Sequence, residues 1–272
     1  MNYFQSIILG VIQGASEFLP ISSSGHLVLA PYLFGWEIPT REAFLFDVLV
    51  QVATLSAVII YYWKDLKAIL ISFIKDLLAG QPFQTQESRL GWFLILSTIP
   101  AGLAALLFKD TLEGAFSNPE FAAIFLLVTS VLLLLGELFG KRARDLSAIT
   151  WRDSLLIGLF QVLSLFPGIS RSGSTITGGL LRNFDRKSSA RYSFLMAVPV
   201  MAAAGVMAGY DLLHSPLLLT NLPVYLAGFV SAAIVGYLAI RWFITYLSRQ
   251  SLYLFAIYCA VVGLGFLIVL NV

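Results

Sequence analysis

Two polar stretches interrupt an otherwise apolar chain, and they contain the residues whose types and spacing could support chemistry. The first carries a carboxylate, Glu17, followed nine positions later by His26, with three serines between them. The second carries an arginine, Arg171, among hydroxyl side chains and glycines. An ionised side chain at the centre of a bilayer costs at least about 2.5 kcal/mol, so charged residues at membrane depth indicate a functional site.

The second stretch has the composition of a phosphate cradle. It reads Pro167, Gly168, Ile169, Ser170, Arg171, Ser172, Gly173, Ser174 and Thr175. A guanidinium presents forked donors to phosphate oxygens, glycine lets a ligand approach the backbone, and a helix N-terminus attracts anions. The guanidinium stays ionised and needs an anion. That anion is either a phosphate group of a ligand or, as the alternative, the carboxylate of Glu17 or Asp47 in a structural ion pair.

The first stretch places Glu17 and His26 on either side of a loop that contains Pro20 and Gly25. A hairpin there could bring both side chains to one ligand. Histidine titrates near neutrality, so His26 could act as a nucleophile or as an acid and base. A simple helix cap is the alternative role for His26. Asp47 either supports the site or lies at the membrane interface.

The composition identifies the class of protein. Of 272 residues, 58% are hydrophobic and 12% are charged, and the mean hydropathy is +0.86, whereas soluble domains carry about 25% charged residues. We therefore expect a polytopic membrane protein. The single cysteine, Cys259, excludes disulfides and cysteine-based metal sites, and we expect it to be a small buried side chain. The first residues lack a basic region and a cleavage site, so we expect no cleaved signal peptide.

Six apolar stretches are long enough to cross a hydrocarbon core of about 30 Å. They cover residues 43–63, 90–108, 119–139, 191–210, 222–247 and 251–271. Two further apolar regions, 4–34 and 152–182, are broken in the middle by proline, glycine and serine. We expect each to form a re-entrant helix-loop-helix hairpin, with its loosened backbone buried in protein. The mixed segment 64–89 predicts an interfacial amphipathic helix followed by a polar loop.

The two broken regions resemble each other. Gly10, Gln13, Ser16 and Gly25 correspond to Gly158, Gln161, Ser164 and Gly173. Each hairpin precedes three spans, and an odd number of crossings inverts the second half relative to the first. We therefore expect an all-α integral membrane protein with a single domain over 1–272. Its inverted-topology repeats would cover about 1–140 and 150–272, with the broken helices marking the site. Chance similarity of two glycine- and serine-rich loops is the alternative.

The basic residues are unequally distributed between the two sides of the expected membrane. Fourteen of the 17 lysines and arginines fall on one side: Lys64, Lys67, Lys75, Arg89, Lys141, Arg142, Arg144, Arg152, Arg182, Arg186, Lys187, Arg191, Arg241 and Arg249. Arg41 and Lys109 fall on the other side. Basic loops face the cytoplasm, so we expect both termini and the site to face outward. We expect Glu137 and Arg241, at inner span ends, to snorkel toward the membrane surface.

The motifs resemble those of a known family. They are Gln13 and Glu17 four positions apart, the Ser-Ser-Ser-Gly-His run of 22–26, and the Pro-Gly-Ile-Ser-Arg-Ser run of 167–172 followed by Thr175. These are similar to the signature motifs of the undecaprenyl-diphosphate phosphatase family, the bacitracin-resistance phosphatases. The resemblance covers the whole chain in length, hydropathy and repeat order. It implies hydrolysis of undecaprenyl diphosphate to the monophosphate and inorganic phosphate at the outer face of the bacterial plasma membrane. That reaction recycles the lipid carrier of cell-wall synthesis and confers bacitracin resistance.

The resemblance also implies roles for individual residues. Glu17, His26 and Arg171 would form the catalytic core, and either His26 or a serine beside it, Ser23, would attack or activate water. The substrate-binding set would be Gln13, Ser22, Ser24, Gly168, Ser170, Ser172 and Thr175. The first motif position of the family is glutamate or glutamine, and here it is Gln13, which leaves one carboxylate in this motif. A divalent cation, Mg²⁺ or Ca²⁺, would bridge the diphosphate and Glu17, with Asp47 as a further ligand.

The expected partners are a prenyl diphosphate lipid and the membrane lipids, without nucleic acid, and a homodimer is an alternative to a monomer. A transporter or flippase of a phosphorylated lipid or small anion is the main rival, because inverted repeats with broken helices are common in transporters. A non-catalytic lipid-binding subunit is a weaker rival. Transport would move the substrate intact, whereas a phosphatase would release inorganic phosphate.

Overall fold

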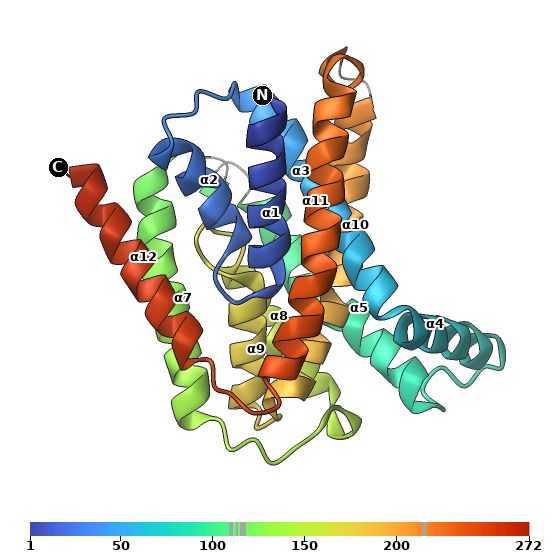
Figure 1. Ribbon diagram of the computed structural model, residues 1–272. Helices are drawn as coiled ribbons and strands as arrows, with labels where there is room; N and C mark the ends of the chain where they lie inside the picture. Colours follow the sequence, from blue (N-terminus) through green and yellow to red (C-terminus); the bar gives the residue numbers. More distant parts are fainter. Residues whose placement is uncertain (109–110, 113, 115–117, 214–215, 272) are drawn as a thin grey trace.

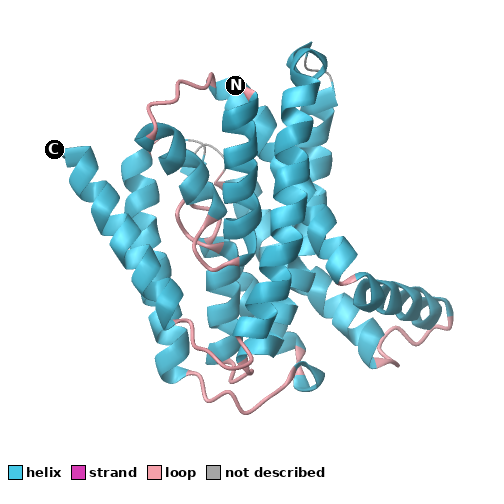
Figure 2. Cartoon of the chain, in the orientation of Figure 1, coloured by secondary structure: helices cyan, strands magenta, loops and turns pink. Residues whose placement is uncertain are grey.

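The computed structural model describes residues 1–108, 111–112, 114, 118–213 and 216–271, without the side chains of 207–213 and 216–220. Within these ranges the chain consists of helices joined by loops, without a β-strand (Figure 2). Lys109, one of the two basic residues expected on the outer side, lies outside the described residues. The all-α fold class is confirmed.

Within the described ranges, six helices have the length and hydropathy of membrane spans, as the sequence predicts. They are α3 (Thr40–Tyr61), α5 (Gln86–Leu107), α7 (Pro119–Phe139), α10 (Arg186–Leu213), α11 (Pro216–Tyr246) and α12 (Tyr253–Asn271). The chain is therefore a multi-pass membrane protein. α5 begins earlier than expected because Thr85 caps it: the Thr85 hydroxyl accepts a hydrogen bond from the Ser88 amide at 3.2 Å.

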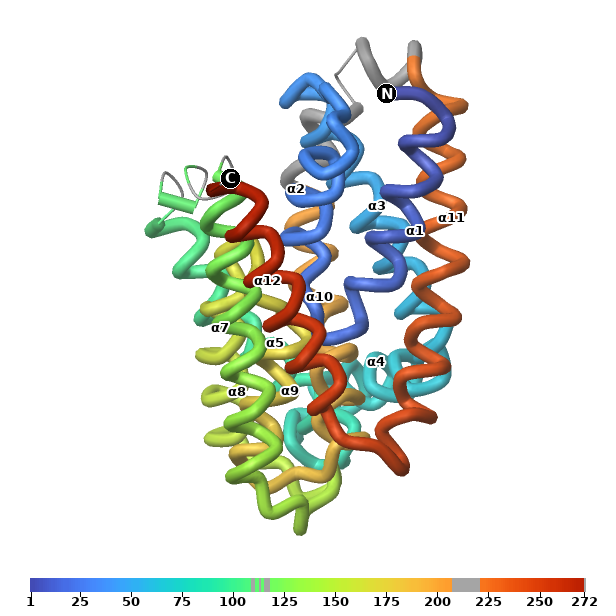
Figure 3. The backbone as a smooth tube through the Cα atoms, turned by 60° about the vertical axis from the view of Figure 1, so that its left-hand side comes forward, coloured from blue at the N-terminus to red at the C-terminus, as the bar shows by residue number. Residues whose placement is uncertain are grey.

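Two pairs of shorter helices occupy the broken regions. α1 (Tyr3–Phe18) and α2 (Ser23–Leu33) form the first pair, and α8 (Trp151–Leu163) and α9 (Arg171–Leu181) form the second. α1 enters from the end of the molecule where both termini lie, α8 enters from the opposite end, and the two connecting loops lie side by side in the middle (Figures 1 and 3). These directions are compatible with two re-entrant hairpins in an inverted repeat, which stays a prediction.

Each pair packs closely on a helix from the other half of the chain. A Cβ added at Gly10 of α1 would lie 2.4 Å from the carbonyl oxygen of Gly228 in α11. A Cβ added at Gly158 of α8 would lie 2.5 Å from the carbonyl oxygen of Ser97 in α5. Both distances are far below van der Waals contact, so only glycine fits at these two positions. Each half of the chain thus supplies the wall behind the other half's hairpin.

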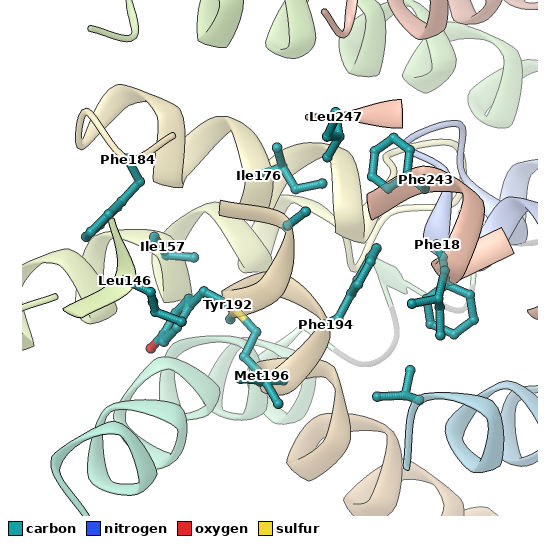
Figure 4. Close-up of a cluster of buried hydrophobic side chains, with 14 of the residues drawn as sticks. Phe18, Leu146, Ile157, Ile176, Phe184, Tyr192, Phe194, Met196, Phe243 and Leu247 are labelled. Atoms are coloured by element: carbon teal, nitrogen blue, oxygen red, sulfur yellow. The ribbon is translucent and has the colours of Figure 1, made fainter. Parts of the chain in front are cut away.

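An apolar cluster at the centre fixes the inner end of α1. Figure 4 shows its aromatic and aliphatic side chains converging from several helices. Phe18, the last residue of α1, is fully buried and packs edge to face on Phe194 of α10, with the ring centroids 5.4 Å apart. Phe194 in turn contacts Phe243 of α11. Burying one such side chain contributes about 1.5–3 kcal/mol, so the cluster holds the neighbouring Glu17 at a defined depth.

α4 (Trp63–Leu78) is the helix expected in the mixed segment, and it projects from the body of the molecule (Figure 1). One face packs on α5, where the ring centroid of Phe73 lies 4.8 Å from that of Trp92. Beside this face, Leu70, Ile74 and Leu78 are exposed. The structure therefore contains the helix that the sequence predicts here, and its position at the membrane interface stays a prediction.

The expectation that Glu137 snorkels is wrong. Its side chain is fully buried at the end of α7 and pairs with Arg142 at 2.5 Å and with Arg186 at 2.6 Å. The same carboxylate accepts the amide hydrogen of Leu252 at 2.9 Å, just before α12. A buried charge must be paired and hydrogen-bonded, and here the basic loop and the start of α10 fold back to supply the partners. Glu137 therefore ties α7 to the starts of α10 and α12.

A second buried carboxylate, Asp153, does the same at the start of α8. It pairs with Arg144 at 2.8 Å and with Arg182 at 2.6 Å. Burial disfavours the charged carboxylate, but hydrogen bonds from Arg144, Arg182 and Thr150 outweigh burial and hold the pKa of Asp153 well below its usual range. The two networks gather four arginines at the end of α7 and the start of α8, and these helix ends lie at the end of the molecule opposite both termini (Figure 1).

The loop between α8 and α9 depends on one glycine. Gly168 has φ +97°, and a Cβ there would lie 2.2 Å from the carbonyl oxygen of Ala122 in α7. Thr129 of α7 holds the loop on both sides of this position. Its hydroxyl donates to the Gly168 carbonyl at 2.9 Å and accepts the Ser170 amide hydrogen at 2.9 Å. Backbone conformation and close packing both require glycine here.

Gly168→Ala should therefore lower the thermal denaturation temperature of the detergent-purified protein. The backbone strain alone costs about 1–3 kcal/mol, and the clash with α7 adds to it. Gly102→Ala is the matched control, because nothing lies within 4 Å of a Cβ at Gly102 of α5. Equal denaturation temperatures for the two variants would contradict the requirement for glycine at 168.

Candidate functional site

The carboxylate of Glu17 lies at the centre of the polar residues that the two hairpins bring together. Its Oε1 accepts a hydrogen bond from Nη2 of Arg171 at 2.8 Å. Its Oε2 accepts from the hydroxyl of Ser23 at 2.6 Å and from the amide of Gln13 at 3.1 Å. The side chains of Glu17 and Arg171 are only 7% and 13% exposed. Four of the predicted site residues thus form one cluster.

Two helix N-termini converge on this carboxylate. Ser22 caps α2 by accepting the Gly25 amide hydrogen at 3.2 Å, and Ser170 caps α9 by accepting the Gly173 amide hydrogen at 3.0 Å. The first helical residue after each cap, Ser23 in α2 and Arg171 in α9, then donates to Glu17. A helix N-terminus attracts negative charge through its free amide hydrogens and its dipole. The position of the Glu17 carboxylate is therefore suited to an anion.

The hairpin tips touch directly. The Ser172 hydroxyl donates to the Leu19 carbonyl at 3.2 Å. A Cβ at Gly25 would lie 3.1 Å from Cα of Gly168, and a Cβ at Gly173 would lie 3.4 Å from Cβ of Pro20. These contacts bring residues of the two motifs, about 150 positions apart in sequence, to one place.

Arg171 is held from a second side by α10. Its Nη1 donates to the Ser193 carbonyl at 3.3 Å. The Thr175 hydroxyl donates to the Arg171 carbonyl at 2.7 Å and shares a hydrogen bond with the Ser193 hydroxyl at 2.7 Å. The guanidinium is therefore held between α10, through Nη1, and Glu17 of the first hairpin, through Nη2.

His26 has partners other than Glu17. Its Nδ1 lies 2.7 Å from the Ser22 carbonyl oxygen, and its Nε2 lies 2.8 Å from the hydroxyl of Tyr258 in α12. Ser22 has φ +70°, in the region that side chains rarely adopt. Strained backbone of this kind costs about 1–3 kcal/mol and often occurs at functional sites. Here it directs the Ser22 carbonyl toward the imidazole.

The remaining predicted residues lie on the two N-terminal turns, apart from Asp47. The Ser24 hydroxyl lies 3.4 Å from that of Ser22, and the Ser172 hydroxyl lies 3.1 Å from that of Ser170. Asp47 is half-buried on α3, and no hydrogen bond joins it to Glu17 among the described residues.

Four contributors were not predicted from the sequence. They are Thr54, Thr129, Ser193 and Tyr258, which reach Gln13, the second loop, Arg171 and His26. Each lies on a long helix outside the two polar motifs, so no local sequence pattern identifies it.

The described side chains do not form a resident cation site. Across the part of the chain that the structure describes, no three acidic, histidine or cysteine side chains gather. Both oxygens of Glu17 already accept hydrogen bonds from protein donors. Mg²⁺ is commonly held by one or two carboxylates together with phosphate oxygens of the substrate. A single carboxylate fits a cation of that kind, and it does not fit a cage built by the protein alone.

The arrangement can support acyl or phosphoryl transfer. Ser23 and Glu17 have the geometry of a nucleophile and its base, at 2.6 Å. Arg171 and the two helix N-termini provide fixed positive charge beside them. The positive charge of Arg171 and the helix N-termini therefore suits a reacting group that carries two or more negative charges.

The chain is similar to proteins of one known family. The family model described as bacitracin resistance protein BacA matches residues 6–265. A protein named undecaprenyl-diphosphatase from Chlorobium phaeobacteroides (strain BS1) is 41% identical over 98% of this chain and 96% of its own length. A protein of the same name from Thermomicrobium roseum is 39% identical over 100% of this chain and 99% of its own length.

A double-mutant cycle tests the pairing at the centre of the site. Glu17→Gln and Arg171→Met should each lower the free energy of unfolding, because each leaves a buried charge without its partner. The double variant should lose less free energy of unfolding than the two single variants together. The difference, measured by denaturant titration, should be roughly 1–3 kcal/mol. The exposed pair of Asp65 and Arg191, at 2.9 Å, is the control. Asp65→Asn with Arg191→Met should couple by less than about 1 kcal/mol. Additive losses at Glu17 and Arg171 would show that the two hairpins do not share one site.

Proposed function

The chain belongs to the bacitracin resistance protein BacA family, and we propose that it hydrolyses undecaprenyl diphosphate to undecaprenyl phosphate and inorganic phosphate. The convergence of Arg171, Ser23 and two helix N-termini on the Glu17 carboxylate is the observation that carries this proposal. Full-length relatives named undecaprenyl-diphosphatase support the substrate.

The side of Arg171 that Glu17 now engages is the side that a phosphate group would bind. A diphosphate entering between the tips of α2 and α9 would compete with Glu17 for Arg171. The planar guanidinium can engage two phosphate oxygens at once. Transfer of Arg171 from the carboxylate to the substrate would free one side of Glu17, while its other oxygen keeps the hydrogen bond from Ser23.

The chemical step then follows from this pair. The Ser23 hydroxyl would attack the terminal phosphorus while its proton passes to Glu17, and the bond between that phosphorus and the bridging oxygen would break. Undecaprenyl phosphate would leave, with the bond's electron pair on its oxygen. The proton on Glu17 would pass to the departing phosphate or to solvent. Water would then attack the phosphorus while its proton passes to Glu17, the bond between phosphorus and the Ser23 oxygen would break, and Ser23 would take that proton back from Glu17 as inorganic phosphate leaves. Arg171 would stabilise the charge on the transferred phosphoryl group throughout.

His26 lies one turn after Ser23 on the same face of α2. Its Nδ1 is occupied by the Ser22 carbonyl, so Nε2 is the nitrogen available to the substrate. We propose that it assists proton transfer at the diphosphate. His26 as the attacking nucleophile, with Ser23 binding phosphate, is the alternative step at the same site.

We propose that a divalent cation, Mg²⁺ or Ca²⁺, enters with the diphosphate. Glu17 is the carboxylate of the cluster that would contact it. The cation would supply neutralisation of phosphate charge. Asp47, on α3 beside the first hairpin, would be a further ligand of the cation.

We propose that the site faces the outside of the bacterial plasma membrane, where the reaction would recycle the lipid carrier and confer bacitracin resistance. The described basic clusters around Glu137 and Asp153 lie at the end opposite both termini. Basic loops are retained in the cytoplasm. This distribution supports an outward position for the two termini and for the loop that leads from α2 to α3.

Release of inorganic phosphate from a prenyl diphosphate in detergent micelles tests the reaction directly. The wild type should release phosphate without any gradient, which a transporter or flippase would not do. Arg171→Lys should fold yet lose about 10²-fold or more in kcat, because lysine cannot engage two oxygens of the transition state at once. Arg191→Lys, at the exposed ion pair, is the control and should retain turnover. A folded Arg171→Lys variant with near-normal kcat would contradict the role of Arg171 in the transition state.

Cysteine labelling tests the orientation. In a Cys259→Ala background, a cysteine at the exposed Glu37 should react with an impermeant thiol reagent applied to intact cells. A cysteine at the exposed Ala143, beside the basic cluster, should react only after permeabilisation. The opposite pattern would place the site on the cytoplasmic side.

A further inference from the structure

Tyr258 contacts His26 from a helix that supplies none of the expected site residues. The Tyr258 hydroxyl lies 2.8 Å from Nε2 of His26, although the two residues are 232 positions apart. Their rings are nearly parallel, with an interplanar angle of 13° and centroids 5.7 Å apart. The distance between the hydroxyl oxygen and Nε2 is that of a hydrogen bond.

The hydrogen bond on the other side of the ring fixes the tautomer. A carbonyl oxygen only accepts, so the contact of 2.7 Å between Nδ1 of His26 and the Ser22 carbonyl requires a hydrogen on Nδ1. In the neutral imidazole Nε2 then carries the lone pair. A phenol hydroxyl is a donor that fits this lone pair. The tautomer of His26 follows from its neighbours alone.

Tyr258 is itself held in place by packing around it. The next residue, Cys259, is buried, as expected, and its Sγ lies 3.6 Å from the Pro20 carbonyl oxygen in the first hairpin loop. Just before these residues on α12, the Ser130 hydroxyl of α7 donates to the Ala256 carbonyl at 2.7 Å. Two adjacent residues of α12 therefore touch the first hairpin, while α7 fixes the helix that presents them.

We propose that Tyr258 is a positioning residue for His26. It donates its hydroxyl hydrogen to Nε2, holds the imidazole in the Nδ1–H tautomer, and gives up this hydrogen bond when Nε2 engages the diphosphate. The inference rests on the proposed function, in which His26 acts at the substrate. It assigns a role in that reaction to α12, the last span of the chain.

Nitrogen NMR of His26 tests the hydrogen bond without any need for activity. The sequence has two histidines, and His214 lies outside the described residues, so His214→Gln leaves one imidazole in a protein labelled at histidine nitrogen. The spectrum should show the Nδ1–H tautomer. Tyr258→Phe, which keeps the ring, should move the Nε2 resonance toward that of a free lone pair. Tyr253→Phe is the matched control, because both tyrosines belong to α12 and both are 39% exposed, and it should leave the resonance unchanged.

Turnover tests the positioning role. Tyr258→Phe should lower kcat about 5- to 10-fold, the scale of one neutral hydrogen bond, and leave KM within about 2-fold. Tyr253→Phe should change neither constant. If Tyr258→Phe does not accumulate as folded protein, 3-fluorotyrosine at position 258 replaces it. A more acidic phenol donates a stronger hydrogen bond, so the Nε2 resonance should shift away from that of a free lone pair.

An Nε2 resonance that is the same in wild type and Tyr258→Phe would overturn the hydrogen bond. A shifted resonance with unchanged kcat would overturn the positioning role. Failure of the wild type to release phosphate would instead contradict the proposed function, and the nitrogen spectrum would still report on Tyr258.

Discussion

The ion pair between Arg171 and Glu17 is the interaction on which the rest of the structure depends. It joins two hairpins across 154 positions of sequence, in surroundings where each side chain is almost fully buried. An unpaired charge in such surroundings costs several kcal/mol, so neither hairpin can reach this depth without the other. The same pair keeps a negative group between two helix N-termini. The requirement for stability and the requirement for anion binding are therefore met by the same atoms.

The broken helices explain how a polar site can exist at this depth. Each break creates a helix N-terminus inside the molecule, where Ser22 and Ser170 cap α2 and α9. The loosened backbone is satisfied by neighbouring spans: Thr129 of α7 bonds both sides of Gly168. The tips can then approach closely enough for the donors on α2 and α9 to reach one carboxylate. Long spans thus act as walls and partners for two short, functional hairpins.

Much of this arrangement could be predicted from the sequence, for identifiable reasons. Span length and hydropathy predict the six long helices, and the pairing of Glu17 with Arg171 follows from the cost of an unpaired charge in the membrane. Glu137 was misassigned because hydropathy places it at a span end but does not reveal that Arg142 and Arg186 fold back over it. Tyr258 was missed because its partner lies 232 positions away. Contacts of that range depend on how spans pack.

Binding of a non-hydrolysable prenyl methylenediphosphonate to wild type and Glu17→Gln, measured by calorimetry in EDTA, tests most directly whether Glu17 and the substrate phosphate compete for Arg171. Removing the charge on Glu17 frees Arg171 without removing any donor to phosphate. The folded variant should therefore bind the ligand roughly 10-fold more tightly, the scale of one hydrogen bond to a charged group. Equal or weaker binding by a folded Glu17→Gln variant would contradict the competition between Glu17 and phosphate for Arg171.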